Sequence, residues 1–306
     1  MANTTTSTVS EPVGQYYESR FLMRAEENFV LEPLGMPGRI PKHRGNTVVW
    51  NRFTNPSAKT SALTEATDPT PTGLSATLVS ATLSQYGNYE RVSDILDLTA
   101  ADSVVEEAID LLAYEAALSI DTIIANTIVS GGTQQLANTA AHRTSVAETD
   151  TMSVTEVRKA VRTLTTFAAP KHTADRYVAV AHPDVVYDLQ GDSNWTNAHI
   201  YTEKGINAVY NGEVGELYGV RFLQSQQTAN ILTNSGSANA EVYITHIMGK
   251  GFFGVSKLQD LTTYVDSPSR NLVLRHGSDV GWKAAFAEAV LNDSFDVRVE
   301  SGATQS

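Results

Sequence analysis

The longest amphipathic pattern in the chain runs from Thr99 to Gly131. Its apolar residues recur every three or four positions, which predicts one helix of about 30 residues. Ser103-Val-Val-Glu106 has the form of a capping box, with Thr99 as an alternative cap one turn earlier, and Gly131-Gly132 supplies a stop. The predicted apolar seam consists of Val105, Ile109, Leu112, Ala116, Ile120 and Ile123.

The opposite side of this helix is polar in its first part and apolar in its last two turns. Its polar side is predicted at Glu107, Asp110, Tyr114 and Asp121, whereas Ile124 and Ile128 make the last two turns apolar nearly all round. We therefore expect a scaffold helix that starts half exposed and ends enveloped, with no catalytic group obvious on it.

Two extended segments precede the helix. β-branched and aromatic residues predict a strand over Asn46–Phe53 and a second over Leu74–Tyr86, whose alternation changes phase at Leu78-Val79 and indicates a bulge or twist. About 20 residues rich in Pro, Thr, Ser and Ala join them. Because an isolated two-stranded ribbon is marginal in water, this one needs a partner surface, and we expect another subunit to provide it.

The N-terminal region has its own pattern. Residues 1–14 are rich in Thr and Ser, and apolar spacing predicts a short helix over Tyr16–Leu31. Proline and glycine then make Glu32–Gly45 extended or turning. The basic residues of this stretch fit either a solvated linker or an arm that crosses onto an acidic neighbour: Arg39, Lys42 and Arg44.

The remainder predicts mixed helices and strands. Ser153-x-x-Glu156 is a second capping box that opens a helix through Phe167, and Pro183–Leu189 is a further helix. Gly281–Leu291 fits helix or strand, and Gly131–Met152 and Gly191–Gly215 are predicted loops. The predicted strands are Arg176–Ala181, Gly219–Gln224, Glu241–Met248, Tyr264–Val265, Leu272–His276 and Phe295–Val299.

Composition narrows the functional classes. The 306 residues carry a net charge of −12, which argues against a surface dominated by nucleic-acid contacts. The absence of cysteine removes disulfides, thiolate catalysis and Cys-ligated zinc, and it suits a reducing cytoplasm. No apolar run approaches the roughly 18 residues of a membrane span, and the polar N-terminus lacks the pattern of a signal peptide.

A search for catalytic motifs finds no convincing site. Gly249-Lys-Gly-Phe-Phe-Gly254 matches G-x-G-x-x-G, but no helix follows to face a pyrophosphate, so we interpret it as a turn or bulge. The seven histidines never fall at metal-ligand spacing, and the carboxylates form no evident acid/base pair. We therefore predict no catalytic, cofactor-binding or metal-binding residues.

The order of elements resembles the major capsid proteins of tailed bacteriophages over roughly Glu32–Arg298. Pro69–Leu74 leading into Val79–Gly87 resembles the return strand of the family's extended loop. The strand and turn motifs of one branch, found in coliphages with a virion-borne RNA polymerase, are resembled by Gly215–Phe222, Met248–Val255 and Gly281-Trp-Lys283.

The resemblance implies an α+β capsid fold. It would begin with an N-terminal arm (1–45) and an extended two-stranded loop (46–88), followed by a peripheral domain (89–152) that contains a spine helix (99–130). An axial domain (153–248) would come next, and the last segment (249–306) would return to the peripheral domain. The arm residues named above would then contact an adjacent subunit, and the spine helix would present Glu107, Asp110 and Tyr114. The loop would contact a neighbour through Trp50, Arg52, Phe53, Lys59, Leu63, Glu65, Leu78 and Tyr86.

Such a chain would assemble with itself as pentamers and hexamers around double-stranded DNA, which it would enclose without sequence-specific binding. Scaffold, portal and decoration proteins are the implied partners, and the virion capsid is the implied location, after assembly in the bacterial cytoplasm. Three alternatives stay open: an encapsulin-like nanocompartment shell, a cytosolic α/β enzyme with an unrecognised site, and a phage tail component.

Overall fold

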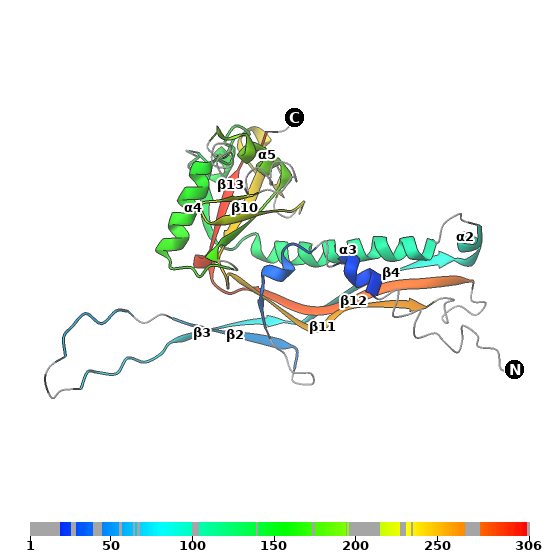
Figure 1. Cartoon of the computed structure of the whole chain (residues 1–306), viewed down its shortest axis with the longest axis horizontal. Helices are drawn as coiled ribbons and strands as arrows, with labels where there is room; N and C mark the ends of the chain where they lie inside the picture. Colours follow the sequence, from blue (N-terminus) through cyan, green and yellow to red (C-terminus); the bar gives the residue numbers. More distant parts are fainter. Residues whose placement is uncertain are drawn as a thin grey trace.

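The computed structural model shows an elongated molecule in which one long helix lies along a narrow sheet (Figure 1). It describes residues 19–25, 29–38, 45–54, 57–63, 65, 68–99, 104–138, 140–172, 175–193, 195, 215–226, 231–233, 235–266 and 276–304. The narrow sheet has four strands in the order β1 (Met36–Pro37), β11 (Phe253–Asp266), β12 (Gly277–Val290) and β4 (Ser84–Ser93). The long helix is α3 (Val104–Ile128), and the short helix α2 (Asp94–Thr99) precedes it.

The core of this part forms between α3 and one face of the sheet. Alternate residues of β12 face the helix, as the two-residue period of a strand requires. Val280, Trp282 and Phe286 lie in one buried cluster with Ile109 and Leu112 of α3. Ala113 and Ala116 of α3 are fully buried in the same cluster, and their small side chains permit close packing.

The predicted spine helix is confirmed over Val104–Ile128, but it does not begin at Thr99; the predicted cap at Ser103 lies outside the described residues. Thr99 ends α2, where its hydroxyl donates to the carbonyl oxygen of Ile95 at 2.7 Å, so it does not cap the long helix. The predicted seam is buried except for Ile123, which is half-buried. Ile124 and Ile128 are fully buried, so the helix ends enveloped as expected.

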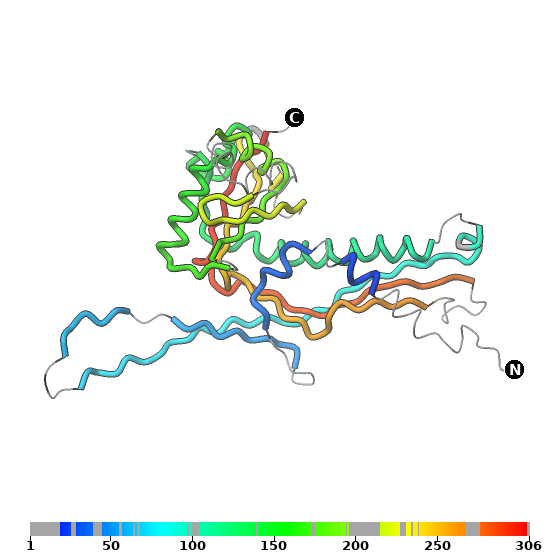
Figure 2. Tube along the Cα trace, in the orientation of Figure 1, coloured from blue at the N-terminus to red at the C-terminus, as the bar shows by residue number. Residues whose placement is uncertain are grey.

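A hairpin leaves the body beneath the narrow sheet (Figures 1 and 2). It pairs β2 (Thr47–Phe53) with β3 (Ala76–Thr82) in an unbroken antiparallel register, so of the two predicted alternatives at Leu78-Val79, a bulge or a twist, the bulge is wrong. The second predicted strand is in fact two, because β3 ends at Thr82 and β4 begins at Ser84 in another sheet.

A second body stands over the C-terminal end of α3 (Figure 1). Its seven-stranded sheet is packed against α4 (Val154–Thr166) and α5 (Pro183–Gly191), and a second buried cluster holds these layers together. The strands run in the order β5 (Thr133–Leu136), β13 (Asp296–Ser301), β10 (Val242–Met248), β6 (Tyr177–Ala181), β8 (Val220–Gln224) and β7 (Glu216–Leu217), with β9 (Ile231–Leu232) paired to β10.

Several local predictions are settled here. Strands β6, β8, β10 and β13 are confirmed, and the ambiguous segment Gly281–Leu291 is a strand within β12. β5 was missed inside a predicted loop because its sequence, Thr-Gln-Gln-Leu, has no apolar alternation. Helix α4 begins as expected, but its predicted box is wrong: Ser153 makes no side-chain cap bond, and the Val154 amide donates to Asp192 Oδ2 at 3.1 Å.

The remaining predictions have mixed outcomes. In the predicted helix Tyr16–Leu31, residues 19–25 are helical and 29–31 are not, while the others lie outside the described residues. Residues 272–275 of a predicted strand and 196–214 of a predicted loop also lie outside them. The segment 249–306 contributes β11 and β12 to the narrow sheet and β13 to the seven-stranded one, a division that the sequence did not predict.

Candidate functional site: exposed surfaces and the junction of the two sheets

The glycine-rich motif forms a turn between two strands. Gly249 and Gly251 join β10 to β11, and Gly251 has a φ of +85°. The segment that follows is the 14-residue strand β11, so no helix N-terminus is available for a phosphate, and the interpretation as a turn is confirmed. Within the part of the chain that the structure describes, no three His, Cys, Asp or Glu residues are grouped to hold a metal ion, and no helix is long and apolar enough to cross a membrane.

The hairpin exposes large apolar side chains beyond its base. Phe53, Leu63 and Leu78 are 64%, 74% and 67% exposed, and Lys59 and Glu65 are exposed as well. Leu74 is 80% exposed although it was not predicted as a contact residue. Apolar surface of this kind, on a projection without a core of its own, marks an interaction site.

Three residues predicted for that interface also have contacts within their own chain. Trp50 is 7% exposed and lies in a cluster with Ala287 and Leu291 of the body. Arg52 Nη1 donates to the Leu291 carbonyl oxygen at 3.2 Å and to Asn292 Oδ1 at 2.9 Å.

Tyr86 lies in β4 and packs against Phe286 with ring centroids 5.1 Å apart. The sequence took the hairpin as free along its whole length, whereas its base lies on the sheet; contact of these three residues with a neighbouring subunit stays a prediction.

The polar side of α3 divides into exposed and bonded groups. Glu107 is exposed and Tyr114 is 44% exposed, as predicted. Asp110 forms a two-point ion pair with Arg20 of the same chain, with Nη2–Oδ2 at 2.7 Å and Nε–Oδ1 at 3.0 Å. Its carboxylate is therefore already paired within the chain. The arm residues Arg39, Lys42 and Arg44 lie outside the described residues.

Asp121 was predicted on the polar side but is buried, because it holds the N-terminal segment. Its Oδ2 accepts the amides of Val30 and Leu31 at 2.7 and 3.2 Å, and its Oδ1 accepts that of Glu32 at 3.2 Å. Burial raises the pKa of Asp121, and the three amide hydrogen bonds oppose that rise. A carboxylate in the middle of an apolar helix end is the signal that could have revealed this role.

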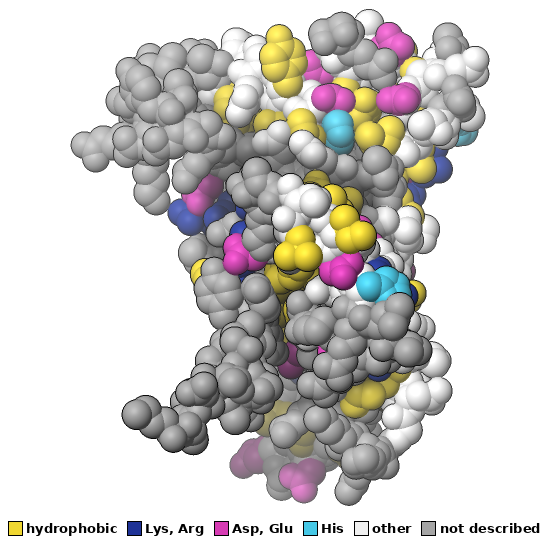
Figure 3. Space-filling view, turned by 90° about the vertical axis from the view of Figure 1, so that its right-hand side faces the viewer, with side chains coloured by type: hydrophobic (Ala, Val, Ile, Leu, Met, Phe, Trp, Pro, Cys, Tyr) yellow, Lys and Arg dark blue, Asp and Glu magenta, His cyan; other side chains and the backbone are white. Residues whose placement is uncertain are grey.

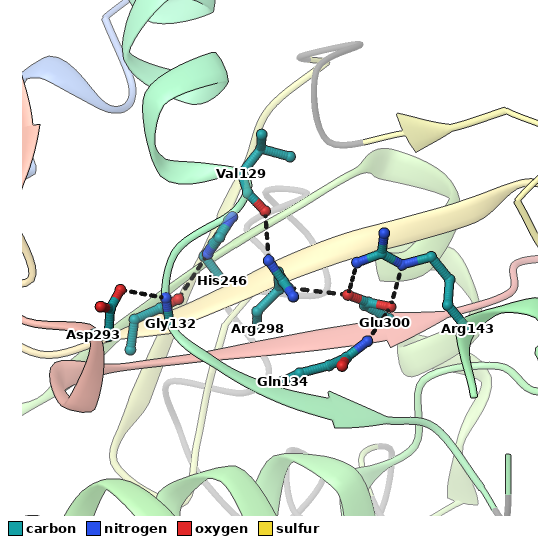
Figure 4. Close-up of polar contacts among 9 residues, drawn as sticks. Val129, Gly132, Gln134, Arg143, His246, Asp293, Arg298 and Glu300 are labelled. Atoms are coloured by element: carbon teal, nitrogen blue, oxygen red, sulfur yellow. Dashed lines mark hydrogen bonds and ion pairs between the residues drawn. The ribbon is translucent and has the colours of Figure 1, made fainter. Parts of the chain in front are cut away.

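The two sheets meet at a polar junction beneath the end of α3 (Figure 4). Arg298 of β13 donates to the Val129 carbonyl oxygen at 2.9 Å, and the Gly132 amide donates to Asp293 Oδ1 at 3.2 Å. Gly132 has a φ of +79°, and a Cβ there would overlap the carboxylate of Asp296. The junction therefore requires glycine at this position.

Two buried carboxylates complete the junction. Burial alone would raise the pKa of Glu300, but the hydrogen bonds from Arg143 and Gln134 and the charges of Arg143 and Arg298 together hold it below its ordinary value. Asp296 lies 2.8 Å from His246 Nδ1, and both side chains are fully buried. Burial raises the pKa of Asp296, and the charge and hydrogen bond of His246 oppose the rise only in part.

A further group of exposed apolar side chains lies at the far end of the molecule, on α2. Ile95, Leu96 and Leu98 are 69%, 50% and 82% exposed. Figure 3 views this end and shows hydrophobic side chains at the surface beside acidic ones. Apolar surface therefore occurs at both ends of the elongated molecule.

This fold is that of known capsid subunits. The chain has TM-scores of 0.68, 0.67 and 0.66 to capsid structures of cyanophage P-SCSP1u, Ralstonia phage GP4 and cyanophage Pam1. The sequence identities are 14%, 14% and 15%, and the matches cover 90%, 85% and 87% of this chain and 89%, 84% and 87% of the others. No curated protein sequence matches the chain. The predicted α+β capsid fold is confirmed.

The family follows from the sequence itself. The profile of the family described as phage capsid protein matches residues 76–291. The chain therefore belongs to the phage capsid protein family. It is a major capsid protein, a structural component of the virion head and not an enzyme, as the sequence predicted.

Proposed function

We propose that this chain builds the icosahedral head of a tailed phage by assembling as pentamers and hexamers around double-stranded DNA. The observation that carries this proposal is the hairpin: four large apolar side chains between Phe53 and Leu78 are more than 60% exposed, beyond a base anchored by Trp50. The apolar surface of such a projection is removed from water only when a neighbouring subunit covers it.

The parts then take the following roles. The hairpin would lie over a neighbouring subunit, and the four-stranded sheet with α3 would form the peripheral domain. The seven-stranded sheet with α4 and α5 would form the axial domain near the symmetry axes, with β5 and β13 included. The arm before residue 46 would run along an adjacent subunit, through Arg39, Lys42 and Arg44.

The net charge of −12 supports confinement of DNA without specific binding, since an acidic shell repels phosphate. Scaffold, portal and decoration proteins are further proposed partners. The segments at 215–222, 248–255 and 281–283 support membership in the branch of coliphages that carry an RNA polymerase in the virion.

Deletion of Phe53–Thr72 tests the role of the hairpin. The cut removes the loop and leaves Gly73-Leu-Ser75 to close the β2–β3 pairing, so the body is expected to fold with an unchanged far-ultraviolet circular dichroism spectrum. Electron microscopy should show hollow particles for the full chain and none for the deletion.

Two results would overturn the proposal. One is a full chain that sediments as a compact monomer under every assembly condition. The other is a deletion that unfolds the body, which would assign the loop to the core.

A further inference from the structure

Among the described residues, the base of the hairpin covers one end of the face of the four-stranded sheet opposite α3. There Val48 and Trp50 of the hairpin base pack on Ala287 and Leu291. Towards the other end of β12, Asp279, Gly281 and Lys283 point to the same side by alternation, away from the helix. The hairpin therefore leaves the far part of this face open.

The open part contains a cleft of about 620 Å³ that is lined mainly by residues of β4 and β12. Tyr264, Gly281 and Tyr89 form one row across three strands, with Gly281 in the middle. A Cβ on Gly281 would lie 2.8 Å from the Cβ of Tyr89, so only glycine leaves this floor free. The two tyrosines are 52% and 65% exposed and form the apolar walls of the cleft.

A cation without a partner lies in the same cleft. Lys283 is half-buried and makes no ion pair or hydrogen bond to any residue that the structure describes. The neighbouring cation, Arg91, is already paired to Asp279 at 2.6 Å. A half-buried ammonium gains most from a carboxylate supplied from outside, because the interaction is less screened there than in open water.

We propose that this cleft, here called the tyrosine cleft, receives the loop between β2 and β3 of a second copy of the chain. The loop carries exposed Leu63 and Leu74 for the tyrosine walls, and the acids Glu65 and Asp68 for Lys283. The loop acids are therefore complementary to Lys283, while the two acids that line the cleft, Asp266 and Asp279, have partners within the chain.

The direction of the hairpin also supports the β2–β3 loop of a second copy as the occupant of the tyrosine cleft. The hairpin leaves the body on the side of the sheet away from α3 and extends past one end of the molecule (Figures 1 and 2). The strand registers place the tyrosine cleft on that same side of the sheet, towards the end of β4 that leads into α2. A copy displaced along the long axis places its cleft against the loop of its neighbour. Such a head-to-tail contact joins two different surfaces, so it can repeat around a ring. This inference rests on the proposed shell function and names the surface that receives the hairpin.

A charge exchange tests the contact. Lys283→Glu should raise the protein concentration needed for particle assembly about tenfold, equivalent to about 1.4 kcal/mol, because it places like charges together. Glu65→Lys combined with Asp68→Lys should do the same, and the triple variant should assemble near the original concentration. Lys283→Arg is the matched control and should assemble normally, since it retains the charge.

Disulfide trapping provides an independent measurement, because the chain has no cysteine of its own. Tyr264→Cys with Leu74→Cys should give reducible cross-linked multimers in assembled particles. Leu111→Cys with Leu74→Cys should not, since Leu111 is exposed on α3, on the other side of the sheet.

The outcomes separate this inference from the proposed function. If the unsubstituted chain forms no particles, both fail. If particles form but Lys283→Glu assembles normally, or the Tyr264→Cys pair does not cross-link, or both cysteine pairs cross-link equally, only the tyrosine cleft is rejected.

Discussion

Arg298 Nη1 lies 2.9 Å from the carbonyl oxygen of Val129, and this hydrogen bond ties a strand of the seven-stranded sheet to the chain just beyond α3. The carbonyl belongs to a helix end, whose last oxygens have no partner within the helix. The guanidinium thereby satisfies a backbone group and joins the two halves of the molecule.

Arg298→Met should therefore loosen the junction. It leaves the Val129 carbonyl without its donor and removes one cation from Glu300, and we expect the free energy of unfolding to fall by about 1–3 kcal/mol. Urea denaturation measures the change. Arg221→Met is a suitable control, because Arg221 is exposed on β8, and it should change stability by less than about 0.5 kcal/mol. Equal effects of the two variants would contradict the role of the junction.

Glu300 predicts a pH dependence of stability. Its pKa in the folded chain lies below the ordinary value of 4.5, so the unfolded chain binds its proton more readily. The stabilisation is therefore complete above about pH 4.5 and is lost as the pH falls through the folded pKa. Glu300→Gln should lower stability at pH 7 and reduce the difference between pH 7 and pH 3. Unfolding curves at both values measure this, and the same pH dependence in variant and wild type would exclude Glu300 as its source.

Asp121→Ala should release the N-terminal segment from α3. Three amides lose their acceptor, so hydrogen exchange at residues 30–32 should accelerate, with a cost of about 1–3 kcal/mol. Asp110→Ala removes only a part-exposed ion pair and should cost at most about 1 kcal/mol. Unchanged exchange in Asp121→Ala would show that other contacts hold the segment.

Substitution of Trp50 should lower stability, whereas substitution of Phe53 should weaken assembly, although both residues lie on β2. Trp50→Ala removes the buried anchor of the hairpin, and we expect it to increase proteolysis of the hairpin and lower stability by about 3 kcal/mol. Phe53 is 64% exposed, so Phe53→Ala should leave stability unchanged and weaken assembly. Melting temperatures and particle yields distinguish the two, and loss of assembly without loss of stability in Trp50→Ala would contradict this assignment.

Local patterns in the sequence determined most of the elements. The three-and-four spacing of apolar residues defined the centre of α3, since a helix places such residues on one face. Alternation and β-branched residues defined β2, β6, β8 and β10. The low apolar content of the loop between β2 and β3 showed that the hairpin could not bury itself.

Tertiary structure decided which polar and aromatic groups are free. Asp121 and Asp110 follow the same helical pattern as exposed residues, but segments about 90 residues away bind them. Trp50 is covered by β12, and β5 is a strand only because β13 pairs with it. These contacts join residues far apart in the chain, so no local pattern records them. The tyrosine cleft likewise exists only because three strands bring Tyr264, Gly281 and Tyr89 into one row.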